Sequence, residues 1–337
     1  MTNRVAYARR EVLAGMAAFG VGFAGMPARA KTGAQRIDVH YHIAPPEWSS
    51  ALEARHIMQP QWNGWSVAKA VEDMDRDGVA LSMVSITTPG VWFGDAAGAG
   101  KLARICNDFA ARMRADHPGR FGIFAAVPMP DIDGTLAEIA YALDELKVDG
   151  IGLLTSYGDK WLGDPAFSPV MAELHRRKAL LYTHPTAANC CRNLIASLPA
   201  PMIEYGTDTT RAIGQLAFGG EAQRYPDIRM IFSHAGGTMP FLYHRFLSQA
   251  SAPKAAPGAL DQLRRFYYDT AQASHAAPMA ALRRVVPMSH ILFGTDYPYR
   301  TAGDTARELR ASGIFKAREI EAVEHANARA LLASAKV

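Results

Sequence analysis

The sequence predicts an α/β fold, a single (β/α)8 TIM barrel, on the basis of three observations. The chain has 337 residues with ordinary globular composition, which is enough for one large core, and such barrels often exceed 200 residues. Eight short apolar runs alternate with helical patterns, and most runs are continuously apolar, as parallel strands covered by helices should be. No glycine-rich phosphate-binding loop follows the first run, which argues against an open dinucleotide-binding sheet.

Each apolar run is predicted to be one strand of the barrel. In chain order these runs are Arg36–Val39, Val79–Ile86, Phe121–Val127, Gly150–Leu154, Ala179–Thr183, Ile228–Ser233, Phe266–Thr270 and Ile291–Gly294. Eight alternations of strand and helix in about 300 residues favour a closed barrel over a doubly wound sheet.

Helical patterns lie between the strands. They cover Ser66–Asp77, Lys101–Asp116, Asp133–Leu146, Phe167–Lys178 and Thr209–Arg224. Ser66 is the predicted N-cap of the first pattern and Asp208 that of the last, because short polar side chains accept hydrogen bonds from a helix's free N–H groups. The connection from His42 to Ser66 is predicted to be a long loop insertion that forms a lid or entrance wall.

Residues 1–30 have the pattern of an export signal, and the barrel is therefore assigned to residues 31–337. Arg9-Arg10 precedes an uncharged stretch that ends at Ala28-Arg29-Ala30, which is an A-x-A cleavage site. The paired arginines resemble a twin-arginine signal, which predicts a periplasmic protein. The alternative is an uncleaved anchoring helix, but the stretch is short and rich in glycine.

Charge and cysteine content exclude some classes of protein. Three of the four net positive charges fall within residues 1–30, so the remainder has no basic surface of the kind that binds nucleic acid. The chain has three cysteines, Cys106, Cys190 and Cys191, and an odd number predicts no disulfide framework. A bond between neighbouring cysteines strains the peptide, so Cys190 and Cys191 are expected to be two unpaired loop residues.

Candidate functional residues follow the predicted strands, where the catalytic groups of such barrels gather. His40 and His42 end the first strand, and their spacing places both side chains on one side of an extended chain. His184 follows the fifth strand, His234 the sixth and Asp296 the eighth. A set of imidazoles with one carboxylate suits Zn²⁺ or another divalent transition metal and leaves room for substrate.

These motifs together resemble the amidohydrolase superfamily. The H-x-H after strand one, the histidines after strands five and six and the Gly-Thr-Asp after strand eight carry the resemblance. The run from Phe232 to Gly237, with Pro240, Phe241 and Arg245, resembles the decarboxylase branch, which includes aminocarboxymuconate-semialdehyde, γ-resorcylate and 6-methylsalicylate decarboxylases.

The resemblance implies a role for each matched residue. It implies one divalent metal ion held by His40, His42, His184 and Asp296. Zn²⁺ is the predicted ion and Mn²⁺ the alternative. The resemblance also implies that His234 and Asp296 are catalytic and that Arg245 binds the substrate carboxylate. The chain departs from the family pattern at two positions. Some phenolic-acid decarboxylases have Glu where this chain has His40. Strand four lacks the lysine that is usual in two-metal members of the superfamily.

The predicted function is non-oxidative decarboxylation of an aromatic, phenolic or conjugated carboxylic acid. The alternative is hydrolysis of a lactone, ester or amide by metal-activated water, because the same residues serve both reactions. A hydratase is a third variant, and a non-enzymatic metal-binding or carbohydrate-binding barrel is the alternative from another class. The predicted partners are a small carboxylic acid and further copies of the chain, as a homodimer or homotetramer, with no nucleic acid and no membrane after signal cleavage.

Overall fold

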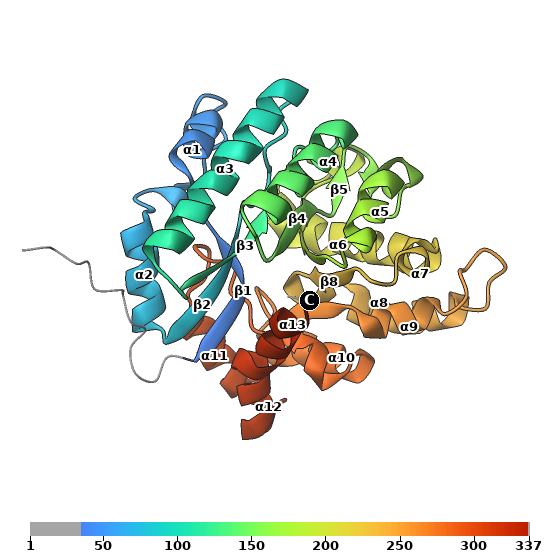
Figure 1. The fold of residues 1–337 in the computed structure, drawn as a ribbon. Helices are drawn as coiled ribbons and strands as arrows, with labels where there is room; N and C mark the ends of the chain where they lie inside the picture. Colours follow the sequence, from blue (N-terminus) through green and yellow to red (C-terminus); the bar gives the residue numbers. More distant parts are fainter. Residues whose placement is uncertain (1–34, 336–337) are drawn as a thin grey trace, which may run out of the picture.

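The computed structural model describes residues 35–335, and in it eight parallel strands form one sheet in the order β1-β2-β3-β4-β7-β8-β9-β10 (Figure 1). These strands are β1 Arg36–His42, β2 Val79–Ser85, β3 Phe121–Ala125, β4 Gly150–Leu154, β7 Leu180–His184, β8 Arg229–Phe232, β9 Tyr267–Asp269 and β10 Ile291–Leu292. A separate antiparallel pair, β5 Ser156–Tyr157 and β6 Lys160–Trp161, follows β4.

The sheet closes because β1 also pairs with the segment around β10. Val39 donates its N–H to the carbonyl of Phe293 at 2.9 Å, and His42 donates to the carbonyl of Tyr297 at 3.0 Å. Tyr41 and Tyr297 form a parallel bridge, and their rings stack at 4.2 Å. The predicted (β/α)8 barrel is therefore confirmed, with all eight predicted strands in place.

Helices surround the barrel. They are α1 Pro46–Glu53, α2 Val67–Arg76, α3 Ala96–Asp116, α4 Ile132–Ala140, α5 Ser168–Arg176, α6 Ala200–Phe218, α7 Glu221–Arg224, α8 Met239–Gln249, α9 Ala259–Arg265, α10 Ala276–Val285, α11 Ala302–Ala311, α12 Ala317–Glu321 and α13 Asn327–Ala335. Short π-helical segments continue α4 over Tyr141–Glu145 and join α12 to α13 over Ala322–Ala326.

Of two helix N-caps predicted from the sequence, the structure confirms one and contradicts the other. The Ser66 hydroxyl accepts the N–H of Lys69 at 3.1 Å, which confirms Ser66 as the N-cap of α2. The cap predicted at Asp208 is wrong, because α6 begins at Ala200 and Asp208 lies inside it, fully buried. Its carboxylate instead accepts hydrogen bonds from the Ser156 hydroxyl at 2.9 Å and the Trp161 indole at 2.6 Å, and so fixes the β5-β6 pair against α6.

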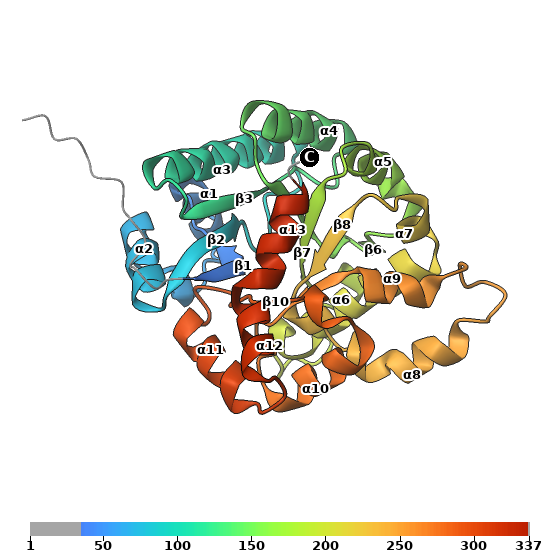
Figure 2. The ribbon, with the colours of Figure 1, turned by 60° about the horizontal axis from the view of Figure 1, so that its bottom comes forward.

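The apolar core has two main layers. The larger layer lies between strands and helices, and a smaller one fills the barrel interior around Val39, Phe124 and Tyr182. Ala328 and Leu331 of α13 belong to the interior layer, and Figure 2 shows α13 lying across this end of the barrel. Because α13 covers one end of the barrel, a functional site can open only at the opposite end, where the carboxyl ends of the strands lie.

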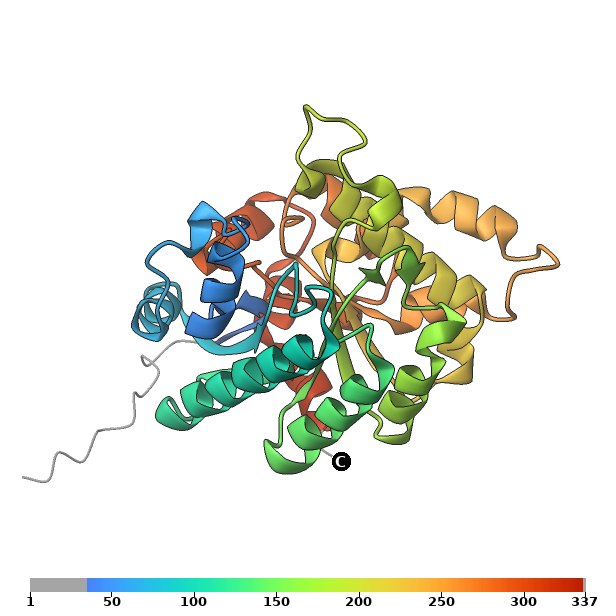
Figure 3. The same cartoon turned by 90° about the horizontal axis from the view of Figure 1, so that it is seen from above.

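The connection after β1 forms part of the wall at that opposite end, which Figure 3 views from above. It is not purely a loop, because it contains α1 and a short 3₁₀ turn at Pro60–Trp62. Trp48 is fully buried and donates its indole N–H to the carbonyl of Gly90 at 2.9 Å, which attaches the connection to the segment after β2. The predicted insertion is thus a packed wall.

The predicted signal at residues 1–30 lies outside the described residues. Within residues 35–335, no helix has the length and apolar character needed to cross a bilayer.

Candidate metal centre

Four side chains predicted as metal ligands converge at the carboxyl ends of the strands. His40, His42, His184 and Asp296 each offer one ligand atom, and these atoms lie within 4.8 Å of one another. All four side chains are buried. Among residues 35–335 this is the one group of three or more His, Cys, Asp or Glu side chains with such geometry.

Asp296 joins this cluster to His234. Its Oδ1 lies 3.1 Å from Nε2 of both His40 and His42, and 3.7 Å from Nε2 of His184. Its Oδ2 faces the other way, 3.3 Å from Nε2 of His234. One carboxylate oxygen therefore points at the three imidazoles, and the other points at a fourth imidazole outside the cluster.

The other nitrogen of each clustered imidazole has a partner in the protein. Nδ1 of His40 lies 2.8 Å from the carboxylate of Asp269, and Nδ1 of His184 donates to the carbonyl of Pro185 at 2.8 Å. Nδ1 of His42 lies 3.0 Å from the Ser85 hydroxyl. Such partners orient metal-binding histidines and leave Nε2 toward the ion. The donor set and its orientation therefore fit one divalent transition metal.

Electrostatics in the cluster also suit a cation. Burial lowers the pKa of His42 to about 3 and that of His184 to about 4, so both rings are neutral, as metal ligands must be. Burial opposes the charged form of His40 too, but the carboxylates of Asp269 and Asp296 outweigh it and raise its pKa to about 10. The buried carboxylates thus favour positive charge at this position.

His234 lies at a strained turn after β8. His234 and Ala235 have φ of 54° and 56°, in the left-handed region that non-glycine residues rarely adopt. Gly237, with φ of 65°, is needed because a Cβ there would collide with the carbonyl of Gly206 in α6. The N–H of His234 donates to Asp269 at 2.9 Å. The turn therefore places the His234 ring beside Asp296, without placing it in the four-residue cluster.

A cavity of about 480 Å³ opens at this point, and we call it the His234 cavity. His184, His234 and Asp296 line it, together with the aromatic side chains of Tyr205 and Tyr299. Its volume falls in the range typical of small-molecule sites. The arrangement can hold a small planar acid between the metal ligands and His234.

Two contributing residues were missed from the sequence. Asp269 is fully buried and contacts both the His40 ring and the His234 backbone. Gln272 donates from Nε2 to Asp296 Oδ2 at 3.1 Å and also lines the His234 cavity. Asp269 ends β9, so inspecting the seventh strand end would have found it. Gln272 lies in a turn with φ of 52° and carries no such signal.

Two other sequence predictions lie apart from the cluster. Arg245 is on α8 with an exposed side chain and does not line the His234 cavity, so its role in substrate binding stays a prediction. The expectation of two unpaired thiols at Cys190 and Cys191 is wrong, because the structure joins them as a disulfide. A short 3₁₀ turn at Asn189–Cys191 brings the neighbouring side chains together.

The amidohydrolase family model matches residues 37–333. The chain belongs to the amidohydrolase family. The 6-methylsalicylic acid decarboxylase of Aspergillus aculeatus is 38% identical over 280 residues, which covers 78% of this chain and 84% of that protein. The enzyme of the same name from Penicillium expansum is 37% identical over 277 residues, covering 78% of this chain and 85% of that protein.

The fold of this amidohydrolase also matches solved structures. The 5-carboxyvanillate decarboxylase of Sphingomonas paucimobilis superimposes with a TM-score of 0.79 at 21% identity, covering 89% of this chain and 99% of that one. This structural match shows the fold. The family match and the two curated relatives confirm the predicted resemblance to the decarboxylase branch, and the relatives favour decarboxylation over the hydrolase alternative.

We expect substitutions of the metal ligands and of His234 to have different effects on the metal content of the protein. Wild-type protein should hold one divalent ion per chain, and His184→Ala or Asp296→Ala should lose both metal and activity because a ligand is removed. His234→Asn should lose activity and keep its metal, because His234 lies outside the cluster. Plasma mass spectrometry of the purified variants measures this, with exposed His244→Asn as the control. Equal metal loss in His234→Asn would make His234 a ligand.

Proposed function

We propose that this amidohydrolase is a metal-dependent, non-oxidative decarboxylase of an aromatic acid, of the hydroxybenzoic class. The observation that carries the proposal is the position of Asp296, with one oxygen on the metal cluster and the other beside His234 in a cavity of small-molecule size. The 6-methylsalicylic acid decarboxylases among its relatives support this substrate class.

The substrate would bind with its carboxylate and adjacent hydroxyl toward the four ligands. A divalent ion held there would supply the positive charge that fixes these two oxygens. The ring would then lie in the His234 cavity, where Tyr205 and Tyr299 offer aromatic surfaces.

In the proposed reaction, His234 delivers the proton that decarboxylation needs. The proton goes from Nε2 to the ring carbon that carries the carboxylate, which interrupts the conjugation of the ring. The bond to the carboxylate carbon then breaks, its electron pair returns to the ring, and CO₂ leaves. Asp296 stabilises the charged imidazole through Oδ2, and Gln272 holds that oxygen in place.

We propose Zn²⁺ as the resident ion. Three imidazoles and one carboxylate are a common zinc donor set. Mn²⁺ prefers more oxygen ligands. Manganese is nevertheless bound in the structure of a dihydroxybenzoic acid decarboxylase from Polaromonas, whose fold this chain shares at a TM-score of 0.78. The metal analysis described above identifies the ion as well as its amount.

We expect CO₂ release from hydroxybenzoates and none of the hydrolase activity. Salicylate, 6-methylsalicylate and 2,6-dihydroxybenzoate should lose their carboxylate absorbance in bicarbonate-free buffer, with one CO₂ formed per molecule consumed. His234→Asn should reduce the rate by about 10²–10⁴, the contribution typical of an acid–base group. Simple lactones and aryl esters form a second panel of substrates, and their hydrolysis is measured by pH-stat. Turnover confined to that second panel would make the protein a hydrolase.

We propose export by the twin-arginine route with cleavage after Ala30. The support is the sequence of residues 1–30, with Arg9-Arg10 and the Ala28-Arg29-Ala30 site. Mass spectrometry of a periplasmic fraction should find Lys31 at the N-terminus, and Arg9→Lys with Arg10→Lys should abolish export. Full-length protein that starts at Met1 and stays in the cytoplasm would contradict the proposal.

We also propose a homodimer or homotetramer and a role for Arg245 in substrate binding. Exposed apolar side chains on α8, Phe241 at 86% and Leu247 at 49%, support self-association near Arg245. Light scattering should give two or four chains, and Arg245→Ala should raise KM with kcat unchanged. Exposed Arg284→Ala on α10 is the matched control for Arg245→Ala. A monomer in light scattering would contradict the proposed oligomer. An equal KM in the two variants would contradict the proposed role of Arg245.

A further inference from the structure

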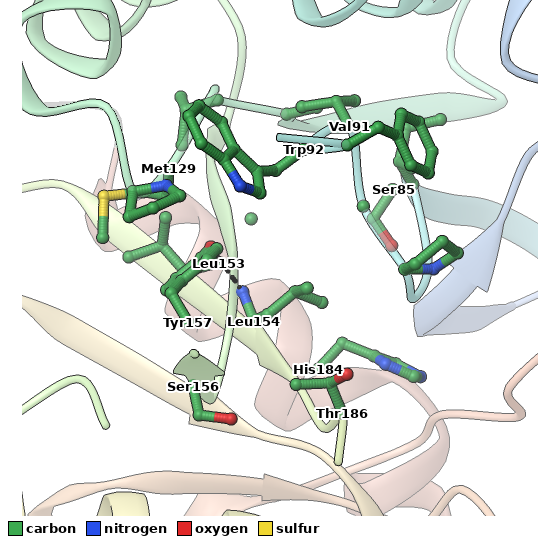
Figure 4. A pocket seen from close by; sticks show the side chains of 18 of the residues that line it. Ser85, Val91, Trp92, Met129, Leu153, Leu154, Ser156, Tyr157, His184 and Thr186 are labelled. Carbon is green, nitrogen blue, oxygen red and sulfur yellow. Dashed lines mark hydrogen bonds between the residues drawn. The ribbon is translucent and has the colours of Figure 1, made fainter. Parts of the chain in front are cut away.

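A second cavity, of about 490 Å³, lies on the other side of His184, and we call it the Trp92 cavity. Figure 4 shows Trp92 facing Leu154 and His184 across it, with Met129 and Tyr157 on one side. His184 lines both cavities. Because His184 belongs to the metal cluster, a molecule bound at the cluster would be adjacent to the Trp92 cavity at this side chain.

The Trp92 cavity has room because β4 carries a glycine, Gly152, which has no side chain to fill it. Gly152 lines the cavity, and a Cβ built on it would meet nothing closer than 3.6 Å. The neighbouring strands contribute Phe124 and Tyr182, whose rings stack at 5.0 Å and line the cavity as well. A side chain added at residue 152 would extend into the cavity without displacing the backbone.

Three hydroxyl groups on the cavity lining already have partners inside the protein, whereas the buried hydroxyl of Tyr182, another lining residue, has none among the described residues. The Ser85 hydroxyl bonds to His42, and the Ser156 hydroxyl donates to Asp208. The Tyr157 hydroxyl accepts the N–H of Leu154 at 2.9 Å. A polar group entering the cavity would lose its hydration without gaining hydrogen bonds from these hydroxyls, which is unfavourable. An apolar group carries no such cost.

The charged group on the lining stays at the solvent edge. Arg192 follows the Cys190–Cys191 pair, its side chain is exposed, and its Nε donates to the carbonyl of Ala187 at 3.0 Å. Trp92, Phe124 and the leucines at the end of β4 form the apolar part of the lining. Most of the residues that line the cavity are apolar, so the cavity suits a hydrocarbon group.

We propose that the Trp92 cavity is a subsite for an apolar substituent on the ring of the aromatic acid, an alkyl or aryl group larger than methyl. This inference rests on the proposed function, because it extends the same substrate beyond the metal cluster. A cavity of about 150 Å³ is enough for benzene, so 490 Å³ exceeds the need of a methyl group. The substrate class is thus 2-hydroxybenzoic acids with an extended apolar side chain.

Binding of the corresponding products tests the subsite directly. Calorimetry of the metal-loaded enzyme with phenol, 3-methylphenol, 3-propylphenol and 3-pentylphenol should show affinity rising about fourfold for each added CH₂. In Gly152→Leu the rise should stop at methyl, because the new side chain fills the cavity, and Gly152→Ala should lie between. Affinity independent of chain length, or the same rise in Gly152→Leu, would overturn the proposal.

Gly100→Leu is the matched control, because it adds the same side chain on α3, where a Cβ at Gly100 meets nothing within 4 Å. Its binding series should equal that of the wild type. Metal content and melting temperature of each variant show that the fold and the metal site are retained. If Gly152→Leu does not fold, Gly152→Ala still decides, since a rise as steep as in the wild type would contradict the subsite.

Turnover separates this proposal from the proposed function. With 6-alkylsalicylates, kcat/KM should rise with chain length in the wild type and fall back in Gly152→Leu. Absence of CO₂ from every acid would refute the decarboxylase assignment, while the phenol series would still decide the subsite. CO₂ release with no dependence on chain length in binding or in kcat/KM would refute the subsite and leave the decarboxylase standing.

Discussion

Closure of the barrel between β1 and the segment after β10 is the constraint on which the site depends. Asp38 is fully buried and accepts both the N–H and the hydroxyl of Thr295, at 3.2 and 2.6 Å. Asp38 also accepts the N–H of His40 at 3.0 Å. One side chain thus joins the first strand to the last and places Asp296 beside the two histidines that end β1. Because residues at opposite ends of the chain form the cluster, the metal site can exist only when the barrel is complete.

Asp269 then connects the metal cluster to His234. One carboxylate oxygen contacts the ring of His40, and the other accepts the backbone N–H of His234. Any movement of this carboxylate changes the orientation of a ligand and the position of His234 together. A buried carboxylate with so many partners costs free energy to desolvate, and its hydrogen bonds offset that cost. The strained φ of His234 is maintained because this bond and the tight contact at Gly237 determine the turn.

Much of the fold and the ligand set were predictable, and what was missed depends on long-range contacts. Strands and ligands follow local rules, because apolar runs mark strands and catalytic groups follow strand ends. Asp208 looked like a helix cap, but the polar groups that bond to it come from the β5-β6 pair, which no local pattern reveals. The Cys190–Cys191 bond depends on a turn conformation. Asp269 was predictable in principle, since it too ends a strand.

The end of β4 contributes space where other strand ends contribute ligands. Two-metal members of the superfamily usually place a lysine on this strand, which would occupy the barrel mouth, whereas this chain has Gly152 and Leu154. The metal cluster is therefore built from β1, β7 and the segment after β10, and β4 contributes no ligand to it. The end of β4 instead lines a largely apolar cavity that reaches His184. Because Gly152 lines this cavity and is not a ligand, a substitution at Gly152 can change the size of the cavity without changing the ligands.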